Sequence, residues 1–375
     1  MGLEQHLVRA GAVSVALLAC VACSSTRPSQ GMLTPVAASV EGASRVSVLA
    51  VTNRQRAKAD AGDMFNGERA DDVSYAAVTV SIPPDGARKV GQVQWPSSAQ
   101  GNPERDFVTV SADYLDKQAF SAAVTRAAKE GGRSSVLVFV HGFNNRFDDA
   151  VYRFAQVVHD SRAAGIPVLF TWPSRGELRL GAYAYDRESA IYSRDALEQL
   201  LDTLAANPNV KEVNILAHSM GNWVTLEALR SKAIGGKGRI GSKVQNVFLV
   251  APDVDVDVFR TQIQRMGNPR PRFALFTSQD DQALGLSQFL WGGMPRLGSV
   301  NPDQAQYRAI LEREQIAVFD LTKLKGSDAH TRAFDDITSV VVMVREQLND
   351  EPVVTSGHRV AGGTSGRRVA SGRVQ

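Results

Sequence analysis

The amino-acid sequence predicts an α/β protein with a mostly parallel central sheet and helices on both faces. Three observations support this fold class. From residue 135 onward, short apolar runs alternate with longer amphipathic segments, and polar or glycine-containing loops separate them. Continuous apolar runs are typical of strands covered on both faces, and their alternation with helices is typical of parallel sheets. The composition, 43% hydrophobic with a formal net charge of +3, is typical of a globular protein and disfavours a nucleic-acid-binding surface.

The N-terminal segment is distinct from the predicted fold. Residues 10–23 are almost wholly apolar and end in small residues and cysteines. This run is shorter than the roughly 17 residues that a membrane-spanning helix requires, and it is typical of a secretory signal peptide over residues 1–23. The sequence Leu-Leu-Ala-Cys ending at Cys20 resembles a bacterial lipobox, so Cys20 is the expected lipidation site and Cys23 the alternative. We therefore expect an exported protein of the bacterial cell envelope, attached to the membrane by a lipid anchor.

Composition divides the rest of the chain into three parts. Residues 24–45 are rich in Ser, Thr, Pro, Gln and Gly, which is typical of a flexible tether. Residues 46–350 are expected to form a single folded domain. Residues 351–375 contain Gly, Ser, Arg and Val without a period and are expected to be disordered.

Nine segments of the folded domain are expected to be strands. Three precede the regular alternation and should form antiparallel strands leading into the main sheet: residues 46–51, 76–82 and 107–111. The apolar runs of the main sheet are residues 136–140, 168–172, 213–216, 247–250, 273–276 and 316–319. Helices are expected at residues 147–162, 187–204, 223–230 and 331–348. In such a sheet the ligand lies beyond the carboxyl ends of the strands, and the amphipathic segment 254–266 is expected to cap that edge.

A motif between one strand and the next helix predicts a nucleophile. Residues 217–221 read Ala-His-Ser-Met-Gly, which is the G-x-S-x-G nucleophile elbow with Ala217 in place of the first glycine. The motif requires small residues two positions before and two after the serine, because larger side chains would collide with the adjoining strand and helix. The sequence therefore predicts that Ser219 lies exposed on a sharp turn above the sheet.

A serine hydroxyl needs a base to take its proton, and six histidines allow elimination. Five are disfavoured by position: His6 in the signal, His358 in the tail, His159 on a helix flank, His218 directed away from its neighbour Ser219, and His141, expected to brace the loop after residues 136–140. His330 remains, in a polar loop after the last expected strand. We therefore expect His330 to be the general base.

The base needs a carboxylate to orient it. Asp281 follows the strand at residues 273–276, and the chain order Ser219, Asp281, His330 is the order found in α/β hydrolases. A buried carboxylate beside Nδ1 of His330 would fix the tautomer of the ring. Asp280 and Asp253 also follow strands, so they remain alternatives.

Stabilising a tetrahedral oxyanion requires two hydrogen-bond donors. The backbone amide of Met220, the residue after the nucleophile, is expected to be one of them. The other is expected from the loop after residues 136–140, where His141-Gly142 lets the backbone turn and directs the amide of Phe143 at the site.

Several stretches together resemble a known family. Residues 138–144, 171–176, 217–222 and 278–284 resemble a bacterial branch of the α/β-hydrolase superfamily that is known only as a domain of unknown function and often occurs in lipoproteins. Residues 52–54 and 78–83 resemble its N-terminal approach. The resemblance covers roughly residues 46–347. It implies the α/β-hydrolase fold, a triad of Ser219, Asp281 and His330, and esterase- or lipase-like chemistry, but it supplies no substrate.

These features favour a serine hydrolase acting on a carboxylic ester, either a small molecule or a lipid. The sequence contains no H-E-x-x-H metal motif, phosphate loop or dinucleotide fingerprint, so no cofactor or metal is expected. Trp172 and Tyr185 are expected to contact substrate, and further candidates for the pocket wall are Phe143, Tyr183, Phe289, Leu290 and Trp291. An acyltransferase with the same triad and a non-catalytic envelope scaffold remain alternatives. The sequence does not indicate an oligomeric state.

Overall fold

The computed structural model describes residues 27–37, 39–58, 62–236, 240–290, 292–324, 329–336 and 340. The expected signal peptide with Cys20 and Cys23, and the expected disordered tail at residues 351–375, lie outside the described residues. So does most of the helix expected at residues 331–348. Within the described part of the chain, no helix combines the length and the apolar character needed to cross a membrane.

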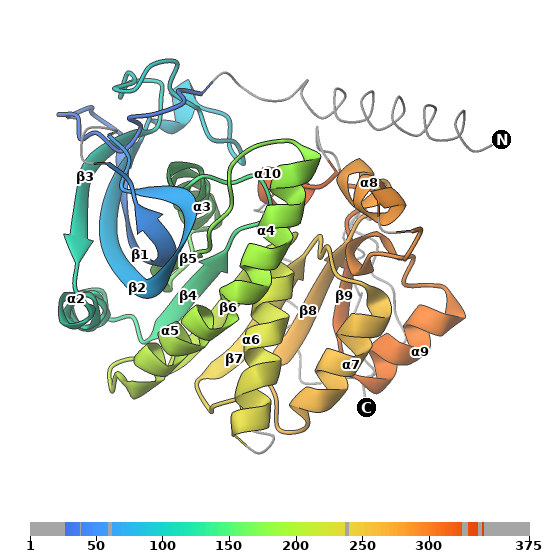
Figure 1. The fold of residues 1–375 in the computed structure, drawn as a ribbon. Helices are drawn as coiled ribbons and strands as arrows, with labels where there is room; N and C mark the ends of the chain where they lie inside the picture. The colour runs from blue at the N-terminus through green and yellow to red at the C-terminus, as the bar shows by residue number, and fades with distance from the viewer. Residues whose placement is uncertain are drawn as a thin grey trace, which may run out of the picture.

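A nine-stranded sheet runs through the centre of the molecule in the order β3-β2-β1-β5-β4-β6-β7-β8-β9 (Figure 1). Its strands are β1 (Ser44–Arg56), β2 (Phe65–Ile82), β3 (Val108–Leu115), β4 (Ser135–Val140), β5 (Ile166–Thr171), β6 (Glu212–His218), β7 (Val244–Val250), β8 (Arg272–Thr277) and β9 (Ala317–Asp320). Strand β2 is antiparallel to both β1 and β3, and every other neighbouring pair is parallel. All nine expected strands are present, and the predicted mostly parallel α/β fold is confirmed.

Helices cover the two faces of this sheet. They are α2 (Lys117–Glu130), α3 (Phe147–Ser161), α4 (Leu180–Tyr192), α5 (Arg194–Ala206), α6 (Gly221–Gly235), α7 (Val256–Met266), α8 (Gln282–Leu290), α9 (Ala305–Arg313) and α10 (Arg332–Asp335), with short 3-10 turns at Asp85–Ala87 and Leu297–Ser299. Helices α4 to α7 lie across one face in Figure 1, and α3 lies on the other.

The hydrophobic core has one layer on each face. The first layer packs α2, α5, α6 and α7 against alternate side chains of β4 and β6, such as Val138 and Ile215. The second packs α3 and α10 against Phe139 and Leu169. All six residues of β5 are buried, because helices cover that strand on both sides. Burial on both faces explains why these strands are continuous apolar runs rather than alternating ones.

The single helix expected at residues 187–204 is two helices in the structure, α4 and α5. They meet at Ser193, whose buried hydroxyl donates to Ser189 O at 2.7 Å. The side chain of Asn53, on β1, lies within hydrogen-bond distance of the same hydroxyl at 3.0 Å. A partner 140 residues away in the sequence holds this break, so local periodicity did not reveal it.

The cap expected at residues 254–266 is wrong. The segment forms α7, whose Phe259, Ile263 and Met266 side chains are fully buried in the first core layer. Its N-terminus is capped by Asp255, whose carboxylate accepts from Asp257 N at 2.9 Å. The amphipathic pattern was correct, but its apolar face covers the sheet rather than the site.

Because α7 belongs to the core, Phe259→Ala should lower the free energy of unfolding by about 3–5 kcal/mol, the usual cost of removing a buried phenyl ring. Urea unfolding would measure this loss. Arg260→Ala, on the solvent side of the same helix in an ion pair with Asp257, should change stability by no more than about 0.5–1 kcal/mol. Equal effects of the two substitutions would contradict the placement of α7 in the core.

Candidate active site

Ser219 lies on the turn between β6 and α6 in a left-handed backbone conformation, with φ of 51°. Its amide donates to Val250 O at 2.9 Å, and its carbonyl accepts from the Asn222 side chain at 2.9 Å. A side chain at position 221 would be impossible without movement, because its Cβ would lie 2.4 Å from His141 O. Positive φ at a serine is uncommon and costs free energy, so these contacts must hold the turn in place. The sharp turn is the one that the elbow motif predicts, but the expected exposure of Ser219 is wrong, because the residue is only 5% exposed.

His330 lies against the carboxylate of Asp281. The distance from His330 Nδ1 to Asp281 Oδ2 is 2.7 Å, and Asp281 is buried. Asp281 also accepts from Leu284 N at 3.0 Å through Oδ1, which fixes the carboxylate at the start of α8. Burial opposes ionisation of Asp281, but the charge and hydrogen bond of His330 outweigh burial and hold the pKa of Asp281 below its usual value. With the proton on Nδ1, the ring presents Nε2 as its acceptor.

His218 holds the backbone of His330 next to the elbow. Its Nε2 lies 3.1 Å from the carbonyl oxygen of His330, so this nitrogen must carry the donated proton. The two imidazole ring centroids are 4.9 Å apart. Burial, together with the nearby His330, lowers the pKa of His218 to about 3. His218 is therefore neutral, and its contact with the carbonyl oxygen of His330 helps to fix the position of that residue.

The two backbone amides that the sequence predicts as oxyanion donors belong to Phe143 and Met220. Among the described residues, none accepts a hydrogen bond from the amide of Phe143 or Met220. Gly142 lets the loop that carries Phe143 approach Ser219, because a Cβ at position 142 would lie 2.8 Å from the Cβ of Ser219. The side chain of Asn145 donates to Gly142 O at 3.3 Å, the carbonyl of the peptide that carries the Phe143 amide, and to Phe143 O at 2.8 Å.

The other two candidate carboxylates have different partners. Asp280 pairs with Arg332, Oδ2 to Nη2 at 2.7 Å, and this hydrogen bond lowers the pKa of Asp280 to about 2. Asp253 accepts from the Tyr183 hydroxyl at 2.6 Å. Of the three aspartates, the structure therefore brings Asp281 together with His330.

Arg54 is a component of the site to which no motif in the sequence pointed. Its guanidinium is buried at 1% exposure and donates to Thr171 Oγ1 at 2.9 Å, Ser174 O at 2.8 Å and Asn145 O at 2.8 Å. It thereby ties the loop that carries Phe143 to the loop after β5. Burial is the main reason that the pKa of Arg54 falls to about 10. A charged residue at the end of an otherwise apolar strand run was the signal that could have revealed it.

Asp186 and His141 make further contacts within the two loops that Arg54 joins. Asp186 on α4 accepts from Ser174 Oγ at 2.5 Å and from Arg175 N at 2.9 Å. The ring of His141 is buried, with Nδ1 2.8 Å from Gly142 O and Nε2 2.9 Å from Thr171 Oγ1. Burial holds the pKa of His141 well below its usual value. The neutral ring braces its loop, as the sequence analysis expects.

The expectation that Trp172 contacts substrate is wrong. Its side chain has no solvent exposure, stacks on His141 with ring centroids 4.9 Å apart, and donates to His141 O at 2.8 Å. An aromatic residue at the end of a buried strand looks the same in sequence whether it faces a pocket or the core.

Tyr185 lies against β2. Its hydroxyl donates to Gly67 O at 3.2 Å, and its ring packs under the guanidinium groups of Arg69 and Arg175. A role of Tyr185 in substrate binding stays a prediction.

The further candidates for the pocket wall lie in different surroundings. The rings of Phe143 and Tyr183 pack edge to face, with centroids 5.1 Å apart, and Phe289 is half exposed. Trp291 lies outside the described residues.

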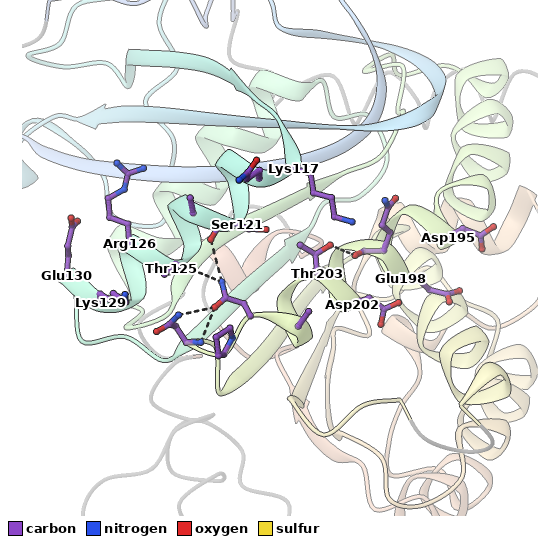
Figure 2. A pocket seen from close by; sticks show the side chains of 17 residues that line it. Lys117, Ser121, Thr125, Arg126, Lys129, Glu130, Asp195, Glu198, Asp202 and Thr203 are labelled. Atoms are coloured by element: carbon purple, nitrogen blue, oxygen red, sulfur yellow. Dashed lines mark hydrogen bonds between the residues drawn. The ribbon is translucent and has the colours of Figure 1, made fainter.

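A groove of about 1200 Å³ lies elsewhere, between α2 and α5 (Figure 2). Basic residues of α2, such as Lys117 and Arg126, face acidic residues of α5, such as Glu198 and Asp202. The groove contains none of the predicted site residues, and its walls are the outer surfaces of two helices that cover the sheet.

The lowered pKa of His218 predicts a loss of stability in acid. The unfolded chain binds a proton at this residue below about pH 6.5, whereas the folded protein does so only near pH 3. Between these values, folding stability should fall as the pH falls, by roughly 2 kcal/mol at pH 5 for this residue alone. In His218→Gln the decrease from pH 7 to pH 5, measured by urea unfolding, should be smaller by that amount. The same decrease in both proteins would contradict a neutral, buried His218.

Comparisons with known proteins agree with this architecture. The model of the family described as "Alpha/beta hydrolase of unknown function (DUF900)" matches residues 116–347, and no curated protein matches the chain. A solved structure that is similar to the chain is a lipase-esterase related protein from Clostridium acetobutylicum ATCC 824, with 11% sequence identity and a TM-score of 0.31. The match covers 58% of this chain and 95% of that chain.

Two further solved structures are similar to the chain. The naproxen esterase (carboxylesterase NP) from Bacillus subtilis has 11% identity, with 58% of this chain and 84% of that chain covered and a TM-score of 0.28. The siderophore hydrolase EstB from Aspergillus nidulans has 12% identity, with 85% of this chain and 98% of that chain covered and a TM-score of 0.37. The family match spans more than half of the chain and confirms the resemblance seen in its motifs. The protein belongs to the α/β hydrolases of unknown function, DUF900.

Proposed function

We propose that the protein is a serine hydrolase that cleaves carboxylic esters, with Ser219 as nucleophile, His330 as base and Asp281 as the orienting acid. The observation that carries this proposal is the 2.7 Å contact between His330 Nδ1 and the buried Asp281 carboxylate, next to a serine at positive φ. A buried carboxylate paired with a histidine beside an elbow serine is the arrangement that activates a hydroxyl.

The chemistry follows from these positions. Nε2 of His330 takes the proton of Ser219 as Oγ attacks the ester carbonyl, and Asp281 stabilises the imidazolium that forms. The amides of Phe143 and Met220 donate to the oxyanion of the tetrahedral intermediate. His330 then gives its proton to the leaving alcohol. Water attacks the acyl-enzyme with the same assistance and releases the acid.

A fluorophosphonate probe tests whether Ser219 is activated. The wild-type protein should be labelled covalently, and Ser219→Ala should not be labelled, because the probe reacts with a nucleophilic serine. Ser161→Ala, at the end of α3, is the matched control and should be labelled like the wild type. An unlabelled wild type would favour the non-catalytic scaffold. Mass spectrometry of the intact protein would measure labelling.

Substitutions of Asp281 and of its neighbour Asp280 distinguish loss of the orienting carboxylate from general damage to the loop. Asp281→Asn should lower kcat for p-nitrophenyl butyrate by about 10³–10⁴-fold, because His330 loses the carboxylate that fixes its tautomer. Asp280→Asn, whose carboxylate pairs with Arg332, should lower it less than about tenfold. Similar losses in the two variants would argue against Asp281 as the triad acid.

We also propose that the chain is exported to the bacterial cell envelope and lipidated at Cys20. The lipobox-like sequence that ends at this cysteine supports the proposal. When the full chain is expressed in a bacterium and extracted with Triton X-114, the wild type should enter the detergent phase and Cys20→Ser should enter the aqueous phase. Cys23→Ser should behave like the wild type, and the reverse result would assign the anchor to Cys23.

A further inference from the structure

A buried polar network lies beside the proposed nucleophile. Asp253, in the turn after β7, accepts from the Tyr183 hydroxyl at 2.6 Å through Oδ2 and from Ser287 Oγ at 2.6 Å through Oδ1. Arg296 completes the network, with Nε 3.4 Å from Asp253 Oδ1. Asp253, Ser287 and Arg296 are between 3% and 6% exposed. Polar side chains from three elements therefore meet here: helix α4, the turn after β7, and helix α8 with the segment that follows it.

Two contacts connect this network to the reacting groups. The amide of Asp253 donates to Ser219 O at 3.3 Å, so the network begins at the backbone of the proposed nucleophile. The Tyr183 ring packs edge to face on Phe143, whose amide is a proposed oxyanion donor. The segment that carries Arg296 is fixed to the same edge of the sheet, because Leu297 N donates to Val254 O at 2.8 Å and Gly298 N donates to Pro252 O at 3.0 Å.

Arg296 is the member of this network whose hydrogen-bonding capacity is unused. A guanidinium carries five N–H donors, and within the described residues Arg296 donates a hydrogen bond to none. At 3.4 Å its contact with Asp253 is a loose ionic one, and Tyr183 and Ser287 already donate to the two oxygens of that carboxylate. Buried polar groups are almost always hydrogen-bonded in folded proteins, and exceptions commonly mark a functional group.

We propose that Arg296 binds a carboxylate on the ester substrate, so that the preferred substrates of this site are anionic esters. This inference rests on the proposed function. The planar fork of a guanidinium matches a carboxylate with two parallel hydrogen bonds. Asp253 already offsets the single positive charge of Arg296, which favours a singly charged carboxylate over a phosphate dianion. A long, purely apolar acyl chain would leave the donors of Arg296 unpaired, which carries a desolvation penalty.

Selectivity between matched esters tests the proposal with purified protein. The first pair is mono-p-nitrophenyl glutarate and p-nitrophenyl valerate, which have acyl chains of equal length with and without a carboxylate. The second pair, 3-carboxyphenyl valerate and phenyl valerate, places the charge in the alcohol instead. For wild type, kcat/KM should be about tenfold to hundredfold higher for the anionic member of one pair, the range expected for a charge-assisted hydrogen bond.

Substitution of Arg296 should remove that selectivity. In Arg296→Gln the ratio of kcat/KM for the anionic and neutral esters should fall to near one, and Arg296→Lys, which keeps the charge without the fork, should give an intermediate ratio. Arg308→Gln, on the exposed side of α9 in an ion pair with Asp303, should retain the wild-type ratio.

Each contrary outcome is distinct. A wild-type ratio near one in both pairs would overturn the carboxylate site, even if Arg296→Gln failed to fold, and would leave the hydrolase proposal standing. A high ratio retained in Arg296→Gln would assign the selectivity to another group and overturn the proposal. Absence of turnover for all four esters, with no fluorophosphonate labelling, would overturn the proposed function and the carboxylate site together.

Discussion

The hydrogen bond between His330 and Asp281 is the interaction on which the site depends, and the register of the sheet makes it possible. His218 pairs with Val250, Val250 with Phe276, and Phe276 with Phe319, so four parallel strands end level with one another. The segments that leave β6, β8 and β9 carry Ser219, Asp281 and His330, and they emerge at the same edge. A slip by one residue in any of these pairings would turn a strand's side chains to the opposite face and separate the three groups. Apolar cores on both faces oppose such a slip, so packing far from the site fixes its geometry.

The side of the proposed site that carries the Phe143 amide depends on buried charge. Arg54 and Asp186 hold the loops after β4 and β5 together through hydrogen bonds to backbone atoms and to short polar side chains. Burial of a guanidinium carries a large desolvation penalty, which these acceptors offset. A network that is satisfied in this way has few alternative arrangements, so the peptide that carries the amide of Phe143 is fixed before any substrate binds. Preorganised donors of this kind stabilise developing charge without further reorganisation.

All nine strands could be predicted from the sequence, whereas helices α2, α8 and α9 were not expected, and parts of the site depend on contacts between residues far apart in the chain. Strands covered on both faces are apolar runs, a local signal, and the elbow at residues 217–221 requires small residues at fixed spacing. The choice between Asp280 and Asp281 depends on side-chain directions at a turn and on Arg332, which is more than fifty residues away. The predictions for Trp172 and α7 failed for a different reason. An apolar pattern indicates that a side chain is buried, but it does not indicate whether the core or a substrate pocket covers it. The structural roles of Arg54 and Arg296 depend on residues from other elements that surround them, so the local sequence does not reveal these roles.

Helix α8 connects the proposed catalytic groups to the proposed carboxylate site. Asp281 caps its N-terminus through Leu284 N, and Ser287, on the same helix, donates to Asp253. A helix is rigid over nine residues, so the acid that orients His330 and the hydroxyl that holds Asp253 keep a fixed separation. Arg296 follows on the chain and is tied to the end of β7 by the backbone of Leu297 and Gly298. Under the two proposals, this helix and the turn after β7 therefore set the distance between the attacked carbonyl and the bound carboxylate. A change in the length of α8 would alter that separation, so under the two proposals the same helix affects both the orientation of His330 and the length of the substrate that fits.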